Sequence, residues 1–309
     1  MRIEKPGIFQ LSRAEYDADP APAPSLNQSL AKVLLERSPR HAWLQHPRLN
    51  PKFEREKQQK FDLGTAAHDV LFNAGRNIKI VPFDDYKKDA AKAARDAALA
   101  AGLMPVKLPE METVDAMVKA AMPQIAQHRD MVGVFPGNGA AEQALVWQEG
   151  ETWCRAAIDW LPPREVGIFL DYKTTGISAN PEQWARQAYE LGYDVQDVFY
   201  RRGLEAVTGR PWECRFIVQE TDPPYALSVC AISPGGLALG HAKVTEALRI
   251  WRWCMERNFW PGYARETAHI EPAPWQMGRW TDRETRQEVS GDMLELGMKV
   301  YAPDEEKAA

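Results

Sequence analysis

The sequence has little of what marks a secreted, membrane-spanning or zinc-bound protein. Its 309 residues include four cysteines, and none of them stands in a C-x-x-C pair or another zinc-type spacing. No apolar run approaches the roughly 18 residues that a membrane span needs, and the N-terminus lacks the apolar segment of a signal peptide. We therefore expect a soluble, cytoplasmic protein without membrane contacts, whose cysteines are buried free thiols.

The chain also lacks an excess of positive charge. It has 38 Lys and Arg against 43 Asp and Glu, a net charge of −5 and a pI of about 5.8. Because proteins that coat nucleic acid are usually basic, any such contact must come from a local patch. Residues 32–60 are the most basic segment, and they favour either a solvated face or a DNA track. The basic residues there are Lys32, Arg37, Arg40, Arg48, Lys52, Arg55, Lys57 and Lys60.

The motifs of several common enzyme classes are absent as well. The sequence contains no G-x-x-x-x-G-K-[ST], G-x-G-x-x-G, G-x-S-x-G or H-E-x-x-H. This removes P-loop nucleotide hydrolases, dinucleotide-binding enzymes, α/β-hydrolases and zinc proteases of the usual type. What is present is a 45% hydrophobic share with 11 Trp, 10 Phe and 9 Tyr, which is enough for a packed core and excludes global disorder.

Hydrophobic periodicity predicts a mixed α/β domain with helices in front of its strands. We expect an extended arm over residues 1–24, a domain over 25–275 with a helical hairpin at about 84–128, and a charged, partly disordered tail over 276–309. Within the domain, the predicted helices are 28–45 (with Pro39 as a kink or a second start), 61–72, 181–208 and 237–257, and the predicted strands are 143–149, 152–161, 166–174, 213–221 and 226–232.

Two neighbouring predicted strands carry acids near their ends. Asp159 follows an apolar run, and Asp171 opens Asp171-Tyr172-Lys173 in the next strand. A hairpin of this length can bring Asp159 and Asp171 side by side, and Lys173 projects to the same face as Asp171. Two acids and a lysine suit a Mg²⁺ nuclease, since the acids hold the metal and the ammonium positions water or offsets phosphate charge. A surface hairpin with a salt bridge explains the same spacing, whereas a glycosidase, which also uses two acids, needs no such lysine.

Three further segments supply candidate residues. Gly64 and His68 lie one turn apart on a predicted helix, where the imidazole can join a Mg²⁺ or Mn²⁺ site or be merely structural. Glu142 leads into the first strand of the predicted meander. Gln196 belongs to a stripe on the helix 181–208 that is otherwise aromatic and typical of a core, and its buried amide needs partners. The stripe consists of Tyr189, Tyr193, Gln196 and Tyr200.

Taken in order, these segments resemble the RecE-like (exonuclease VIII) branch of the PD-(D/E)XK nucleases, which is similar to phage lambda exonuclease and the RecB nuclease domain. The resemblance covers most of residues 25–263 and ends on Trp260-Pro261-Gly262-Tyr263. Each motif is weak alone, and the ordered set is specific. The matching segments are Ser25 through Pro39, Phe61 through His68, Glu142 with Trp147, Arg155 through Asp159 with Leu170 through Thr175, and Tyr189 through Tyr200.

The resemblance implies a role for each matching residue and a PD-(D/E)XK restriction-endonuclease-like core, with a mixed central sheet flanked by helices and N-terminal helical decoration. It implies Mg²⁺ or Mn²⁺ as cofactor, and no iron–sulfur cluster, because the first cysteine is Cys154, inside the core. The implied metal ligands are His68, Asp159, Asp171 and the Tyr172 carbonyl; the implied catalytic residues are Lys173, Glu142, Gln196 and Tyr200; and the implied DNA-end contacts are Arg37, Ser38 and Arg40.

For function, the resemblance implies a phage-type DNA exonuclease that resects double-stranded ends 5′→3′ for single-strand annealing recombination. Its implied partners are double-stranded DNA ends and a single-strand annealing protein. A ring-shaped trimer or tetramer would gather basic segments in a central channel, which would reconcile DNA binding with an acidic chain. Two alternatives stay open: a structure- or end-specific endonuclease of the same fold, and a non-catalytic DNA-binding protein on a nuclease scaffold.

Overall fold

The computed structural model describes residues 2–54, 63–74, 78–101 and 103–290, with side chains described up to residue 285. The chain separates into two compact units, residues 1–262 and residues 263–309. The first holds the sheet and all of the predicted site residues. In the second, the described part forms α10 (Pro274–Ser290) within the segment expected to be a charged tail.

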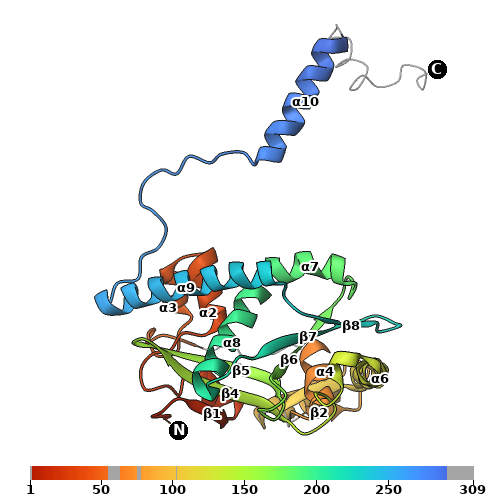
Figure 1. The fold of residues 1–309 in the computed structure, drawn as a ribbon. Coiled ribbons are helices and arrows are strands. Elements are labelled where there is room, and N and C mark those ends of the chain that lie inside the picture. The colour runs from red at the N-terminus through yellow and green to blue at the C-terminus, as the bar shows by residue number, and fades with distance from the viewer. Residues whose placement is uncertain (1, 55–62, 75–77, 102, 291–309) are drawn as a thin grey trace, which may run out of the picture. The chain divides into compact units, whose positions relative to one another are not determined.

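Six strands of the first unit form a mixed sheet in the order β1-β4-β5-β6-β7-β8 among the described residues (Figure 1). All neighbours are antiparallel except β6 and β7, which run parallel. The predicted mixed α/β class is therefore confirmed. The strands are β1 (Gly7–Gln10), β4 (Ala140–Glu149), β5 (Thr152–Leu161), β6 (Ile168–Thr175), β7 (Glu213–Glu220) and β8 (Leu227–Cys230).

Helices cover both faces of this sheet, because alternate residues of the strands are apolar on each side. On β6, Phe169 packs into the cluster around α8 and α9, whereas Leu170 packs into the cluster around α4 and α6. On β4, Val146 faces a third cluster formed by the N-terminal segment. The helices of the first face are α2 (Gln28–Glu36), α3 (Pro39–Leu44), α7 (Pro181–Glu190), α8 (Tyr193–Thr208) and α9 (Pro234–Arg257), and those of the second are α4 (Leu63–Leu71) and α6 (Leu108–Gln127).

The segment expected to be an extended arm instead joins the fold. Its strand β1 pairs with β4, and α1 (Arg13–Asp17) follows at once. Ser12 and Glu15 form a capping box, in which each side chain accepts from the backbone N–H of the other residue. Ile3 and Leu11 are buried in the third cluster. The proline-rich composition of residues 19–24 led to the prediction of an extended arm. The spacing Ser12-x-x-Glu15, however, is that of a capping box and indicates the start of a helix.

The long helix predicted over 181–208 is two helices. Gly192 separates α7 from α8 with a φ of 67°, in the left-handed region that glycine adopts without steric cost. A side chain at this position would also collide with that of Lys32 on α2. Tyr189 consequently lies on α7 and is 37% exposed, so it does not belong to the stripe that continues from Tyr193 along α8.

The predicted hairpin at 84–128 holds two helices as expected, α5 (Asp89–Ala100) and α6. Between them, β3 (Met104–Lys107) pairs in parallel with β2 (Ile78–Val81) to make a small second sheet, and a 3₁₀ turn, η1 (Arg129–Met131), follows α6. The start of the predicted helix 61–72, residues 61 and 62, lies outside the described residues. All four cysteines are free. No described helix is both long and apolar enough to cross a bilayer.

Candidate metal and catalytic site

Three acids lie in a row across the middle of the sheet. The residues on either side of Glu142 pair with those on either side of Asp159, so these two acids stand opposite each other on β4 and β5. The pairing of Trp160 with Leu170, continued by one residue, brings Asp171 of β6 opposite Asp159. Side chains at opposed positions of antiparallel strands share a face and lie close. The hairpin therefore places its two acids as the sequence predicts, with a third beside them.

The backbone at Glu142 is unusual for a strand. Its φ of 51° lies in the left-handed region, which costs a residue with a side chain about 1–2 kcal/mol. Strain of this kind persists where the surrounding structure enforces it, and it concentrates at functional sites. Here it accompanies a carboxylate directed at His68, which is consistent with a functional role for Glu142.

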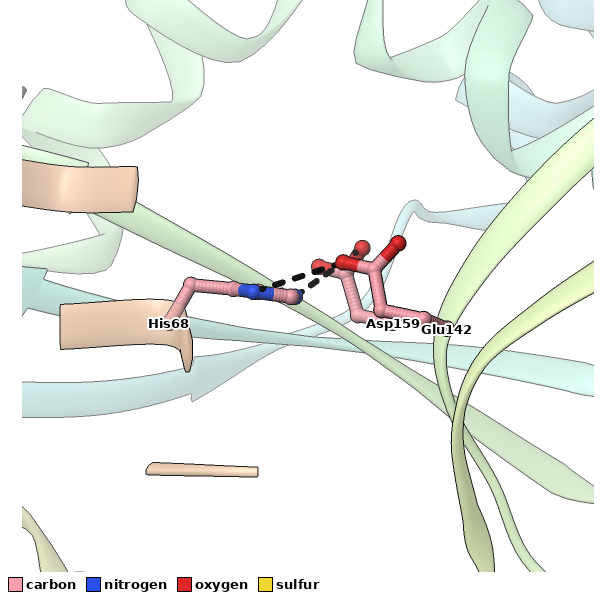
Figure 2. A group of neighbouring side chains, drawn as sticks. All are labelled: His68, Glu142 and Asp159. Atoms are coloured by element: carbon pink, nitrogen blue, oxygen red, sulfur yellow. Dashed lines mark ion pairs between the residues drawn. The ribbon is translucent and has the colours of Figure 1, made fainter. Parts of the chain in front are cut away.

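His68 reaches the acids from α4, which approaches β6 closely. Gly64, one turn earlier, leaves no room for a side chain, because a Cβ there would collide with the Thr174 hydroxyl. The imidazole lies edge-on to the carboxylates (Figure 2). Its Nε2 is 3.4 Å from Asp159 Oδ1, and its Nδ1 is 3.6 Å from Glu142 Oε1 and 3.3 Å from Asp69 Oδ1.

This group has the composition and size of a divalent-cation site. One ligand atom from each of His68, Glu142 and Asp159 lies within 4.8 Å of the others. Carboxylate oxygens and an imidazole nitrogen suit Mg²⁺ or Mn²⁺. His68 Nε2 is buried and makes no hydrogen bond, which is the state expected of an atom that has a metal as its partner. The residues present therefore fit a divalent metal ion.

Asp171 is joined to a lysine and an amide on the side of α8. It is 2% exposed, pairs with Lys173 Nζ, and accepts a hydrogen bond from Gln196 Nε2. Lys173 in turn lies 4.9 Å from the centre of the Tyr193 ring. The buried amide of Gln196 thus has Asp171, a predicted metal ligand, as its hydrogen-bond partner. Asp159 is fixed to the same strand, since it accepts from the Tyr172 N–H at 2.8 Å.

The two central acids have opposite pKa shifts. Burial raises the pKa of Asp171 to about 6, with the Asp159 charge adding to it and Lys173 opposing it. Burial also works against ionisation of Asp159, but the charge of His68 beside it, followed by that of Lys173, outweighs burial and lowers the pKa of Asp159. Asp159 is therefore the acid that stays ionised, and Asp171 is the one that gains a proton first.

The acids also change the pKa values of the two nearby cationic groups, His68 and Lys173. Burial opposes the charge of His68, but Asp159, Asp69 and Glu142 together raise its pKa to about 10. Burial likewise opposes the charge of Lys173, and Asp171 and Asp159 raise the pKa of its ammonium above the ordinary lysine value. Without a metal ion, the imidazolium and the ammonium balance the carboxylates.

Comparisons with known proteins identify the family and the fold. The model of a family described as "PDDEXK-like domain of unknown function (DUF3799)" matches residues 29–272. The chain belongs to this family. A crystal structure of a protein from Eubacterium rectale, provisionally named an exonuclease, matches with a TM-score of 0.52 and 11% identity over 85% of this chain and 96% of that one, which shows a shared fold. No curated protein matches significantly. The predicted PD-(D/E)XK-like fold is thus confirmed.

In this PDDEXK-like domain, the acids and their partners open into one pocket of about 380 Å³. Its lining includes all of the predicted catalytic and metal-binding residues. Tyr172 OH points away to Gln219 Oε1 at 2.6 Å, so its predicted contribution of a carbonyl ligand concerns only the backbone. Tyr200 is 6% exposed and also packs in the core. The predicted residues in the lining are His68, Glu142, Asp159, Asp171, Tyr172, Lys173, Gln196 and Tyr200.

One wall of the pocket comes from residues that the sequence analysis did not single out. They belong to α1 and to the start of α2, and they are Arg13, Tyr16, Asp17, Asn27, Gln28 and Ser29. The capping box at Ser12 announces the helix α1, but no local signal shows that it lies beside residues about 140 positions further along the chain.

The three predicted DNA-end contacts are not in the pocket lining. Ser38 is buried at the N-cap of α3, with its hydroxyl 2.7 Å from His41 Nδ1. Arg37 and Arg40 are exposed, and the guanidinium of Arg40 lies 4.6 Å from the centre of the Trp43 ring. A role of these residues at DNA ends stays a prediction.

Proposed function

We propose that this protein is a Mg²⁺-dependent deoxyribonuclease that degrades double-stranded DNA from its ends. The observation that carries the proposal is the pocket in which His68, Glu142 and Asp159 meet the Asp171–Lys173 pair. The family fold supports it, because hydrolysis of phosphodiesters by such a fold relies on acids that hold a metal ion next to a lysine.

Each side chain of the pocket has a proposed role that follows from its charge. His68, Asp159 and Asp171 are the residues that would hold the metal ion, with Glu142 as an additional acid. When bound, Mg²⁺ offsets the phosphate charge and makes water a better nucleophile at neutral pH. Lys173 has a raised pKa and remains protonated, so it donates hydrogen bonds to the nucleophilic water or to a phosphate oxygen and is not a general base. Gln196 holds Asp171 in place.

The finer parts of the proposal rest on resemblance. An exonuclease with 5′→3′ polarity, a ring-shaped oligomer and a single-strand annealing protein as partner are what the RecE-like motif order implies. The fold shared with the Eubacterium rectale protein, which bears an exonuclease name, supports the choice of exonuclease over endonuclease.

Digestion of linear duplex DNA labelled at the 5′ or the 3′ end tests the proposal. With Mg²⁺ we expect progressive loss of mononucleotides from linear DNA, release of the 5′ label first, and no cutting of a covalently closed circle. EDTA should stop the reaction. Cutting of the circle would establish the endonuclease alternative, and the absence of any cutting with Mg²⁺ or Mn²⁺ would support the non-catalytic one.

A matched pair of variants ties the activity to the pocket. Lys173→Ala should abolish digestion. Lys243→Ala should not, although Lys243 also forms an ion pair with a buried acid, Asp194, at 2.7 Å on α8. Equal activity of Lys173→Ala and wild type would contradict the assignment.

A further inference from the structure

Among the residues that the structure describes, acids outnumber cations in the lining of the pocket, although the proposed enzyme must hold a polyanion. These residues contribute four carboxylates, those of Asp17, Glu142, Asp159 and Asp171, and the cations Arg13, Lys173 and His68. Lys173 is mostly buried and is paired with Asp171. Arg13 is the one arginine among the described residues that line the pocket, and its side chain is 53% exposed. The side chain of Arg13 is therefore much more exposed than those of Glu142 and Asp159, at 18% and 19%, which is what a residue near the rim of the pocket would show.

The position of Arg13 is set by a rigid frame. Strand β1 pairs with β4 up to Gln10 and Gln143, directly beside Glu142, and α1 begins three residues later. The Ser12–Glu15 capping box fixes the first turn of α1. Tyr16, on the same helix, has the guanidinium carbons of Arg13 and Arg155 at 5.7 and 5.6 Å from its ring centre.

Among the described residues, the Arg13 guanidinium donates a hydrogen bond to one partner, Asp17, through Nε. Arg13 Nε is 2.9 Å from Asp17 Oδ2, an i,i+4 ion pair on the helix surface. A guanidinium carries five N–H donors in a planar fork that matches phosphate geometry, and this contact engages Nε. Asp17 thus orients Arg13 and lowers the net charge of the rim at the same time.

From these observations we infer that Arg13 binds a backbone phosphate of the DNA strand at the rim of the pocket, so that α1 forms the substrate-holding wall of the site. This rests on the proposed function and deepens it. Residues 7–17 lie before the family match, which begins at residue 29.

The test measures binding and cleavage separately. Binding is followed by the fluorescence anisotropy of a labelled duplex with Ca²⁺ in place of Mg²⁺, over a range of NaCl concentrations; cleavage is followed with Mg²⁺. Arg13→Gln should raise Kd and KM for DNA about five- to tenfold at low salt and reduce the slope of log Kd against log [NaCl] by about one, with kcat nearly unchanged. Arg13→Lys should restore the salt slope.

Two control variants separate the charge of Arg13 from the stability of α1. Arg186→Gln removes an equivalent i,i+4 pair, Arg186–Glu190, on an exposed face of α7, and should leave Kd and its salt slope unchanged. Asp17→Asn breaks the same pair as Arg13→Gln but removes a negative charge from the rim, so it should tighten DNA binding about twofold. Weaker binding by Asp17→Asn would show that helix integrity, and not the charge of Arg13, matters.

The outcomes distinguish this inference from the proposed function. If wild type digests DNA and Arg13→Gln matches Arg186→Gln in Kd, KM and salt slope, the phosphate contact is refuted and the nuclease stands. If wild type binds DNA without digesting it, the nuclease falls, and the Kd values of the variants still decide the role of Arg13. If wild type neither binds nor digests DNA, both are refuted.

Discussion

Two of the clusters of buried charge in the described part of the chain shift the pKa of an aspartate in opposite directions. In the first, which we call the anchor network, Asp19 accepts from Ser25 N at 2.9 Å and from Ser25 Oγ at 2.6 Å, and it lies near Arg155 and His46 at 3.2 and 3.3 Å. In the second, the pocket cluster, Asp171 meets Lys173 and Gln196. The two aspartates are 4% and 2% exposed.

Their pKa values diverge because their partners differ. Burial opposes the charge of Asp19, but His46, Arg155 and Ser25 outweigh it and lower its pKa. Burial raises the pKa of Asp171 to about 6, with Asp159 adding to it. Asp19 has the partners that a permanent anion needs, and it fastens the N-terminal segment to β5. Asp171 has fewer partners that stabilise its ionised form, as expected of an acid whose further partner is a metal ion.

The largest effect that this comparison predicts is on activity. Asp171→Asn should reduce DNA digestion on the order of a thousandfold, because a metal ligand is lost. The free energy of unfolding without metal at pH 7.5 should stay within about 1 kcal/mol of wild type, since the cost of ionising Asp171 in the folded protein is removed and Asp159 remains near Lys173 as a counter-ion. Digestion assays and urea unfolding in EDTA measure the two quantities. A large loss of stability would show that Asp171, like Asp19, serves mainly to stabilise the fold.

The second prediction concerns Asp19, where we expect the opposite result, a loss of stability with little change in activity. Asp19→Asn should lower the free energy of unfolding by about 3 kcal/mol, because it leaves Arg155 buried without its anion. Asparagine tolerates the left-handed backbone found at Asp19, where φ is 60°, so the loss reports on charge. Below the unfolding transition, kcat should remain near that of wild type. A selective loss of kcat with unchanged unfolding would show that the anchor network serves catalysis.

The sequence reveals the pocket cluster better than the anchor network, for a physical reason. Asp159, Asp171 and Lys173 lie on adjacent strands of a hairpin, so period-2 alternation places Asp171 and Lys173 on one face and the length of the hairpin brings Asp159 beside them. His68 and Gln196 lie on separate predicted helices, and only the order of the motifs and the family resemblance assigned them to the same site. The Asp19–Arg155 pair joins residues 136 positions apart (155 − 19), and neither residue has a spacing that announces it.

The predictions that were wrong share one cause: each rested on a local sequence pattern, and tertiary contacts determine the structure there instead. Residues 1–24 were predicted to be an arm from proline content, but Ile3 and Leu11 bury against β4 and hold the segment in the fold. The helix 181–208 was predicted to be continuous, but Gly192 adopts a left-handed φ of 67° that separates two helices, and Lys32 Nζ donates a hydrogen bond to the Leu191 carbonyl at the end of the first. The left-handed Glu142 has no sequence signature.

A third prediction concerns pH, and it uses the raised pKa values of the pocket cluster. A carboxylate or imidazole must lose its proton to bind a metal ion, so acid competes with Mg²⁺. Below about pH 6, where Asp171 becomes protonated without metal, this proton should add a further factor of about ten per pH unit to the fall in Mg²⁺ affinity, and the stabilisation of the fold by Mg²⁺ should fall with it. Titration calorimetry and thermal unfolding with Mg²⁺ between pH 5 and 9 measure this.

His68 extends the same test to alkaline pH. Its pKa of about 10 means that Mg²⁺ binding through Nε2 must displace a proton at neutral pH. Mg²⁺ affinity should therefore continue to rise between pH 7 and 9 in wild type and should be flat over this range in His68→Gln. A flat profile in wild type would show that His68 stays protonated beside the metal and is not its ligand.

The smallest predicted effect concerns Tyr172, which lies between the two acids but directs its side chain elsewhere. Tyr172→Phe removes the 2.6 Å hydrogen bond to Gln219 Oε1 and leaves the backbone N–H on Asp159 in place. We expect a loss of about 1 kcal/mol in the free energy of unfolding, because a buried amide oxygen loses its donor, and a change in kcat of less than about twofold. A kcat reduced more than tenfold at unchanged stability would mean that the hydroxyl reaches the reacting groups, and the pocket cluster would then extend to Gln219.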